Sequence, residues 1–118
     1  MTALYVAVAG AAGVLARYGI GRATFHSEAL IWSTVGINLL GSFLLGLLTA
    51  SDWFSRDARE AIGVGFLGGF TTYSTFSVQV VLETDGGRAG TAMAYLAVTV
   101  VGGIGCAVGG YALGRAVT

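Results

Sequence analysis

The feature that most constrains this chain is the length of its stretches without a charged residue. Residues 30–50, 61–82 and 89–114 contain no Asp, Glu, Lys or Arg, and residues 3–22 contain only Arg17 and Arg22. A transmembrane α-helix needs about 20 predominantly apolar residues to cross the hydrocarbon core. The sequence therefore predicts an all-α membrane protein with four transmembrane helices, at about 3–22, 30–50, 61–82 and 89–114.

Composition and the connecting segments agree with this prediction. The chain of 118 residues is 55% hydrophobic and 10% charged, with a mean hydropathy of +0.80, which lies outside the usual range of soluble domains. The connections GRATFHSE, SDWFSRDARE and ETDGGR are short and polar and hold most of the charges. We therefore expect residues 1–118 to form a single transmembrane unit whose first span is retained rather than cleaved as a signal peptide.

The arginines do not specify an orientation in the membrane. With four spans both termini share a side, and three arginines fall on each side of the membrane. The two groups are Arg56, Arg59 and Arg115 on one side and Arg17, Arg22 and Arg88 on the other. The positive-inside rule then gives no decision. One reading is a single weakly specified orientation; the sharper hypothesis is dual topology, in which two copies meet antiparallel in one membrane.

Small residues at helical spacing predict close helix packing, within the chain or between chains. Three pairs are spaced i, i+4, as in the small-xxx-small pattern of membrane helices. They are Gly105 with Gly109, Gly110 with Gly114, and Ser42 with Gly46.

Titratable groups are absent from the predicted spans, and this argues against two classes of function. No carboxylate, lysine or histidine lies in any of them, and His26 falls in a loop. A proton-coupled antiporter needs a titratable group in the membrane, and a hydrolase needs a base beside its nucleophile. The single Cys106 excludes an internal disulfide.

Neutral hydrogen-bonding side chains occur instead, in rows along the helix faces. These rows are Thr34, Asn38 and Ser42; Thr72, Thr75 and Gln79; and Thr91, Tyr95 and Thr99. One row alone is most simply explained as hydrogen bonding between helices. Three rows together favour a path for an anion, because neutral donors bind an ion without holding it as a fixed charge would. The positive edges of Tyr73 and Phe76 would also suit an anion.

Three glycines in the third span raise a separate question. Gly65, Gly68 and Gly69 lie near its middle, where glycine disfavours a helix. A break there would expose carbonyl oxygens able to bind a hard cation such as sodium. The alternative is that the glycines permit close packing of helices.

Three motifs carry a family resemblance. GAAGVLARYG in the first span, GINLLGSFLLGLL in the second and GFLGGFTTYSTFS in the third resemble the Fluc-type, or CrcB-like, fluoride channels over the whole chain. The resemblance implies a passive fluoride channel that relieves fluoride toxicity, built as an antiparallel, dual-topology homodimer with two pores. It also implies that the third helix is broken near its middle. A structural sodium ion at the dimer interface would be held there by the backbone carbonyls of Gly68 and Thr71 from each subunit.

The resemblance also implies residue roles. The fluoride pathway would consist of Asn38, Tyr73, Ser74, Thr75, Phe76, Tyr95 and Thr99. Arg17 matches a vestibule or structural arginine. The chain departs from the family at Tyr73, commonly Phe, at Gln79, where many members have glutamate, and at Gly103, where some carry a hydroxyl.

The implied setting is a bacterial-type plasma (inner) membrane, which the chain crosses several times, with fluoride, lipid and a second copy as partners and no nucleic acid. The main alternative is a small multidrug transporter, which shares the size and the antiparallel dimer. That class depends on a membrane-embedded glutamate in the first helix, and this chain has none. A structural membrane module is the remaining alternative.

Overall fold

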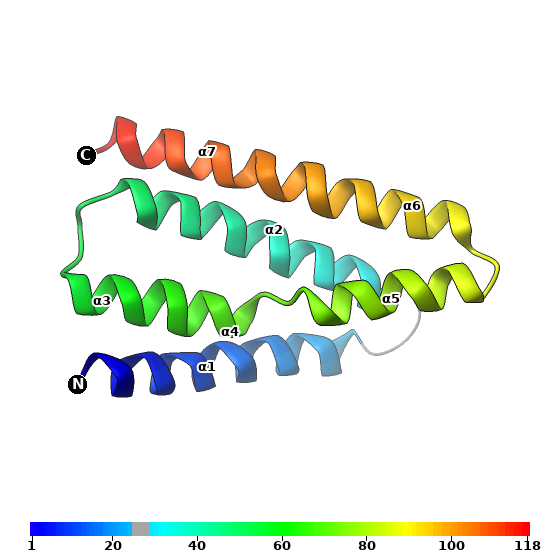
Figure 1. The fold of residues 1–118 in the computed structure, drawn as a ribbon, viewed down its shortest axis with the longest axis horizontal. Helices are drawn as coiled ribbons and strands as arrows, with labels where there is room; N and C mark the ends of the chain where they lie inside the picture. Colours follow the sequence, from blue (N-terminus) through cyan, green and yellow to red (C-terminus); the bar gives the residue numbers. More distant parts are fainter. Residues whose placement is uncertain (25–28) are drawn as a thin grey trace.

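The computed structural model describes residues 1–24 and 29–118, and within these ranges the chain is helical and without strands. His26 lies outside the described residues. The first two spans are α1 (Thr2–Ala23) and α2 (Ala29–Ala50). The third contains α3 (Arg56–Glu60), the π-helical segment η1 (Ala61–Leu67), α4 (Gly68–Phe70) and α5 (Ser74–Asp85). The fourth contains α6 (Ala89–Ala97), the π-helical segment η2 (Val98–Gly102) and α7 (Gly103–Ala116). The spans lie side by side, and both termini are at the same end (Figure 1).

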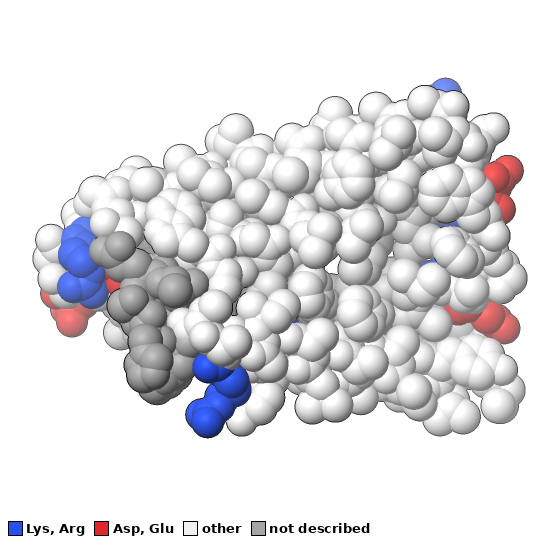
Figure 2. All heavy atoms as spheres, turned by 180° about the vertical axis from the view of Figure 1, so that it is seen from behind, with Lys and Arg blue, Asp and Glu red and all other residues white. Residues whose placement is uncertain are grey.

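The described helices fit a membrane. Three runs are long and apolar enough to cross it, at Thr2–Ala23, Ile31–Ala50 and Ala89–Ala116. Large apolar side chains such as Leu15, Val101 and Ile104 are exposed, as expected for a surface that faces lipid. On the face in Figure 2, most charged atoms lie toward the two ends of the long axis. The all-helical, multi-pass membrane architecture predicted from the sequence is confirmed.

The third span differs from the others because residues 71–73 are not helical. Thr71 has an extended backbone, with φ −84° and ψ 160°. The glycines just before it are helical, and Gly68 has φ −62° and ψ −39°. A Cβ atom on Gly69 would lie 2.6 Å from the carbonyl oxygen of Gly10. The glycines of α4 and η1 therefore allow α1 to approach closely.

Two close helix pairs organise the bundle. In one, α1 packs against η1 and α4; in the other, α2 packs against α7. A Cβ atom on Gly110 would overlap the carbonyl oxygen of Phe43, and one on Gly114 would lie 2.7 Å from that of Leu47. The predicted pair Gly110 and Gly114 thus packs within the chain, whereas Gly105 and Gly109 face open space among the described residues.

Beyond the interruption the third span changes its neighbours. Whereas η1 and α4 pack mainly on α1, α5 packs mainly on α6. Ile31 and Val35 of α2, Phe76 of α5 and Tyr95 of α6 form a buried cluster there. The interruption therefore allows the first part of the third span to pack on α1 and the last part to pack on α6.

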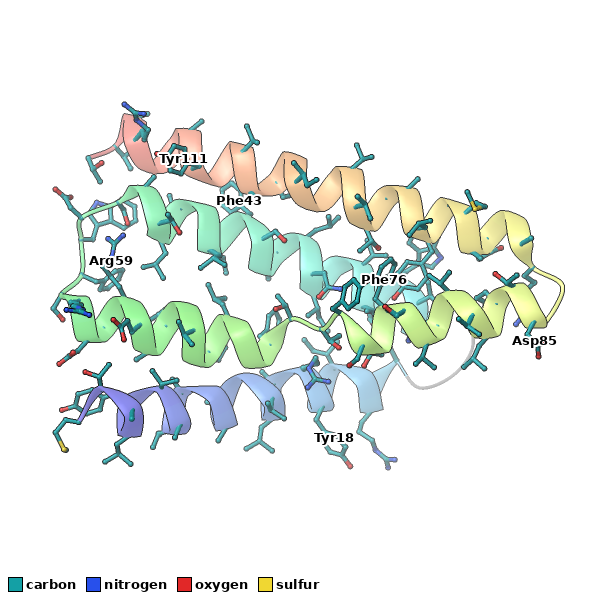
Figure 3. All side chains as sticks on the ribbon, viewed as in Figure 1. Tyr18, Phe43, Arg59, Phe76, Asp85 and Tyr111 are labelled. Carbon is teal, nitrogen blue, oxygen red and sulfur yellow. The ribbon has the colours of Figure 1, made fainter. Side chains whose placement is uncertain are left out.

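The ends of the second and third spans are joined by an arginine. The Arg59 side chain reaches from α3 toward the end of α2 (Figure 3). Its guanidinium donates to the carbonyl oxygens of Ser51 and of Thr49, the latter at 2.9 Å. These carbonyls at the end of α2 lack partners within the helix, so Arg59 satisfies acceptors that would otherwise depend on water.

Candidate functional site

A cavity of about 400 Å³ lies beside the interruption, between the two close helix pairs. Its lining combines apolar side chains, glycines and neutral polar groups, without a charged residue among the described ones. The polar and aromatic lining residues are Asn38, Ser42, Thr71, Thr72, Tyr73, Phe76 and Thr99. Gly68 and Gly103 also line it. Both π-helical segments contribute, through Gly63 and Leu67 and through Thr99 and Val100. Such segments are often found at functional sites.

The side chain of Asn38 holds the interruption open through two hydrogen bonds. Its Nδ2 donates to the carbonyl oxygen of Thr72 at 3.0 Å, and its Oδ1 accepts from the Thr72 amide at 2.9 Å. The Asn38 side chain thus satisfies both backbone polar groups of Thr72, its N–H and its carbonyl oxygen, in place of helical partners. Because an unpaired backbone group is costly at membrane depth, Asn38 makes this non-helical conformation possible.

The carbonyl oxygens of Gly68 and Thr71 are among those that lose their helical partners at the interruption. In a continuous helix the Thr72 amide would donate to Gly68, but here it donates to Asn38. The Thr75 amide would donate to Thr71, but it donates at 3.2 Å to the hydroxyl of Thr72. None of the hydrogen bonds found between the described residues at the interruption ends at the carbonyl oxygen of Gly68 or of Thr71. These are the two carbonyls that the resemblance assigned to sodium.

The aromatic residues form a series of edge-to-face contacts next to the cavity. Phe76 is buried at the start of α5, with its ring directed toward α2 (Figure 3). Its ring centroid lies 5.0 Å from that of Tyr95 and 6.1 Å from that of Tyr73, with interplanar angles of 64° and 62°. Tyr73 is 80% exposed. The Phe76 ring is therefore packed against Tyr95, whereas most of the Tyr73 side chain is left uncovered by the described residues.

Tyr95 and Thr99 occupy different surroundings although their spacing predicts one helix face. Tyr95 is completely buried and lines neither this cavity nor the second one described below. Its hydroxyl donates to Oε1 of Gln79. Thr99 lines the cavity, and its hydroxyl is the one enclosed side-chain polar atom without a hydrogen-bond partner among the described residues. The π-helical turn that begins at Val98 lies between them and changes the register of the helix.

A second cavity, of about 300 Å³, lies on the other side of Thr72. Its lining is basic and hydroxyl-rich, and includes Arg17, Arg22, Thr34 and Thr75. Arg17 is fixed there because its Nε donates to the carbonyl oxygen of Gly69 at 3.1 Å. Ser74 is exposed and lines neither cavity. Thr72 borders both cavities. Of the predicted pathway residues, four line the neutral cavity, Thr75 lines the basic one, and Ser74 and Tyr95 line neither.

Gln79 is a site residue whose role sequence reasoning missed. The sequence placed it on the face shared by Thr72 and Thr75, but its contact with Tyr95 joins α5 to α6, and no local pattern shows that contact. The signals in the sequence were its place in a row with Thr72 and Thr75 and its position where many family members have glutamate.

Among the described residues, no group of three or more His, Cys, Asp or Glu side chains is placed to bind a metal ion. The candidate cation ligands are therefore the backbone oxygens described above.

Comparison with known proteins agrees with the geometry. Residues 4–111 match the family described as "CrcB-like protein, Camphor Resistance (CrcB)". The chain belongs to the CrcB-like family. A CrcB-like relative from Thermus thermophilus, named "Fluoride-specific ion channel FluC", is 42% identical, with 96% of this chain and 94% of the relative covered. Relatives of the same name from Rhodospirillum centenum and Idiomarina loihiensis are 39% and 42% identical, covering 95% and 81% of this chain and 94% and 78% of theirs. The family resemblance seen in the sequence is confirmed.

Proposed function

We propose that this protein is a fluoride-specific ion channel that lets fluoride leave the cell passively. CrcB-like relatives that carry the name of such a channel match nearly the whole chain. The observation that supports this function best is the uncharged cavity at the interruption, with the hydroxyl of Thr99 enclosed and without a partner. A permeating ion must bind firmly enough to lose water and weakly enough to leave. Neutral donors meet both demands, and a narrow row of them favours small fluoride over chloride.

The pathway runs, in this proposal, along Asn38, Tyr73, Ser74, Thr75, Phe76, Tyr95 and Thr99, with Arg17 and Arg22 at its basic entrance. Phe76 and Tyr73 present ring edges, whose positive rim attracts an anion. Tyr95 contributes by holding Phe76 in place.

The functional unit we propose is an antiparallel, dual-topology homodimer with two pores. The equal division of the six arginines supports it, because neither orientation is favoured. The exposed Tyr73 and the open face at Gly105 and Gly109 also leave surface for a second copy. A reporter active on one side of the membrane, fused to the C-terminus, tests the topology; a signal from one orientation alone would refute it.

The broken third helix holds, in this proposal, a structural sodium ion at the dimer interface. The carbonyl oxygens of Gly68 and Thr71 fit this role, since they lack other donors and border the cavity. Uncharged oxygens suit a hard cation. A bound sodium ion would supply fixed positive charge near the path of an anion.

The membrane in question is the plasma membrane of a bacterial-type cell. With the interior negative, an anion is driven outward by about 2.3 kcal/mol per charge for each 100 mV. That force is enough to drain fluoride that entered as the neutral acid, without an energy source.

Flux through liposomes that contain only the purified protein tests the function. Fluoride efflux is expected to be rapid and uncoupled from protons, and chloride efflux to be near background. Proton-coupled transport of organic cations would instead support a small multidrug transporter, and no flux at all would support a structural module.

A further inference from the structure

Gln79 is a buried polar residue to which the proposed pathway gives no role. It lies in α5, its side chain is 8% exposed, and its Oε1 accepts a hydrogen bond from the hydroxyl of Tyr95. The side chain of Thr34 in α2 is hydrogen bonded to the same Tyr95 hydroxyl. Three transmembrane segments thus meet in one small network.

The direction of these hydrogen bonds fixes the orientation of the amide. A tyrosine hydroxyl has a single proton, and here it goes to Gln79. The bond between Thr34 and Tyr95 is therefore donated by the threonine. The network runs in one direction, from Thr34 to Tyr95 to Gln79, and it holds the amide oxygen toward α6. The NH₂ group of Gln79, on the other side of the same planar amide, must point away from Tyr95.

This NH₂ group lacks a partner in the described part of the chain. No hydrogen bond found there uses the Gln79 nitrogen. The one fully enclosed side-chain polar atom without a partner among the described residues is Thr99 Oγ1, so the Gln79 nitrogen is not fully enclosed. The nitrogen therefore borders accessible space. An amide donor pair left unpaired at membrane depth is costly, so a hydrogen-bond acceptor from outside the described residues would stabilise it.

The residues around Gln79 indicate what binds its NH₂ group. Thr75 lies one helical turn earlier on the same face and borders the basic cavity, together with Thr34. Phe76 borders the neutral cavity. We infer that the amide NH₂ of Gln79 is an anion-binding donor on the ion path beyond Phe76, and that Tyr95 and Thr34 are positioning residues that orient it. This inference rests on the proposed fluoride channel, and it replaces direct binding of the ion by the Tyr95 hydroxyl, whose only proton is already donated.

Two nearly isosteric variants test the inference by fluoride efflux from liposomes. Gln79→Met removes the donors and is expected to slow efflux about tenfold or more. Tyr95→Phe leaves the amide in place without its orienting bond and is expected to slow efflux by a smaller factor. Because Tyr95 acts through Gln79, the double variant should be no slower than Gln79→Met alone, whereas a purely structural Tyr95 would make the two effects multiply. Val78→Met, at an exposed position of the same helix, is the matched control and should conduct like wild type.

Three results would overturn the inference. These are wild-type efflux in Gln79→Met, multiplied effects in the double variant, and separation of the copies by Gln79→Met on size-exclusion chromatography, which would mean that the amide binds a second copy. If Gln79→Met aggregates, Tyr95→Phe decides: slower efflux with an unchanged elution volume supports the inference, and wild-type efflux overturns it. Failure of the wild-type protein to pass fluoride would instead refute the proposed function.

Discussion

Asn38 provides the sharpest test of how the interruption in the third span supports conduction. Asn38→Leu keeps the branched shape of the side chain but removes both hydrogen bonds to Thr72, at 3.0 and 2.9 Å. Each such bond contributes about 1 kcal/mol net, so the interrupted conformation should lose about 2 kcal/mol. That corresponds to a change of about 30-fold in the equilibrium between the interrupted and the continuous helix.

The freed Thr72 amide has an alternative partner close by. The carbonyl oxygen of Gly68 is one helical turn earlier and has no other donor among the described residues. We therefore expect the helix to close across residues 71–73, which would occupy a proposed sodium ligand and alter the cavity. Fluoride efflux should fall, by up to about 30-fold where the two conformations start near balance, while helix content does not decrease. Asn38→Asp keeps only the acceptor and should also abolish flux.

The assay is fluoride efflux from liposomes, measured with a fluoride electrode. Thr49→Val is the matched control, because it removes a hydroxyl from the same helix whose bond, to the carbonyl oxygen of Leu45 at 2.7 Å, is local to α2. Size-exclusion chromatography in detergent should show both variants assembled like wild type. Near-normal efflux from a folded Asn38→Leu protein would refute this account of the interruption.

Three further predictions follow from the same geometry. Phe76→Ile should abolish flux without dissociating the protein, because it removes the ring edge and two aromatic contacts worth about 0.5–1.5 kcal/mol each; undiminished efflux would contradict it. Gly110→Ala should lower the unfolding temperature in detergent, since overpacking costs about 1–3 kcal/mol, whereas Gly36→Ala in α2, where a Cβ atom would meet nothing within 4 Å among the described residues, should be neutral or stabilising; equal behaviour of the two would be inconsistent with the α2–α7 contact. Replacing sodium by N-methylglucamine should lower both efflux and unfolding temperature, and no change in either would argue against a sodium ion at Gly68 and Thr71.

Some of the site was visible in the sequence because it depends on local residue order. The rows of neutral side chains were present, and six of the predicted residues do line one cavity: Asn38, Gly68, Thr71, Tyr73, Phe76 and Thr99. Whether they conduct or bind an ion stays a prediction. The place of Tyr95 was not visible, because the π-helical turn after it changes the register that an ideal helix would give.

What the sequence by itself determined is that this chain lies in a membrane as a set of helices, three of whose predicted spans carry no charge. Transfer of a helix into lipid depends on the composition of about 20 consecutive residues, which can be read directly. Only the tertiary structure decided where the backbone leaves the helix. The glycines at 68 and 69 are the obvious local weak point, yet they are helical, and the interruption lies at residues 71–73. Its position depends on Asn38, 34 residues earlier in the chain, because a backbone group in lipid gives up its helical partner only where another helix supplies a replacement.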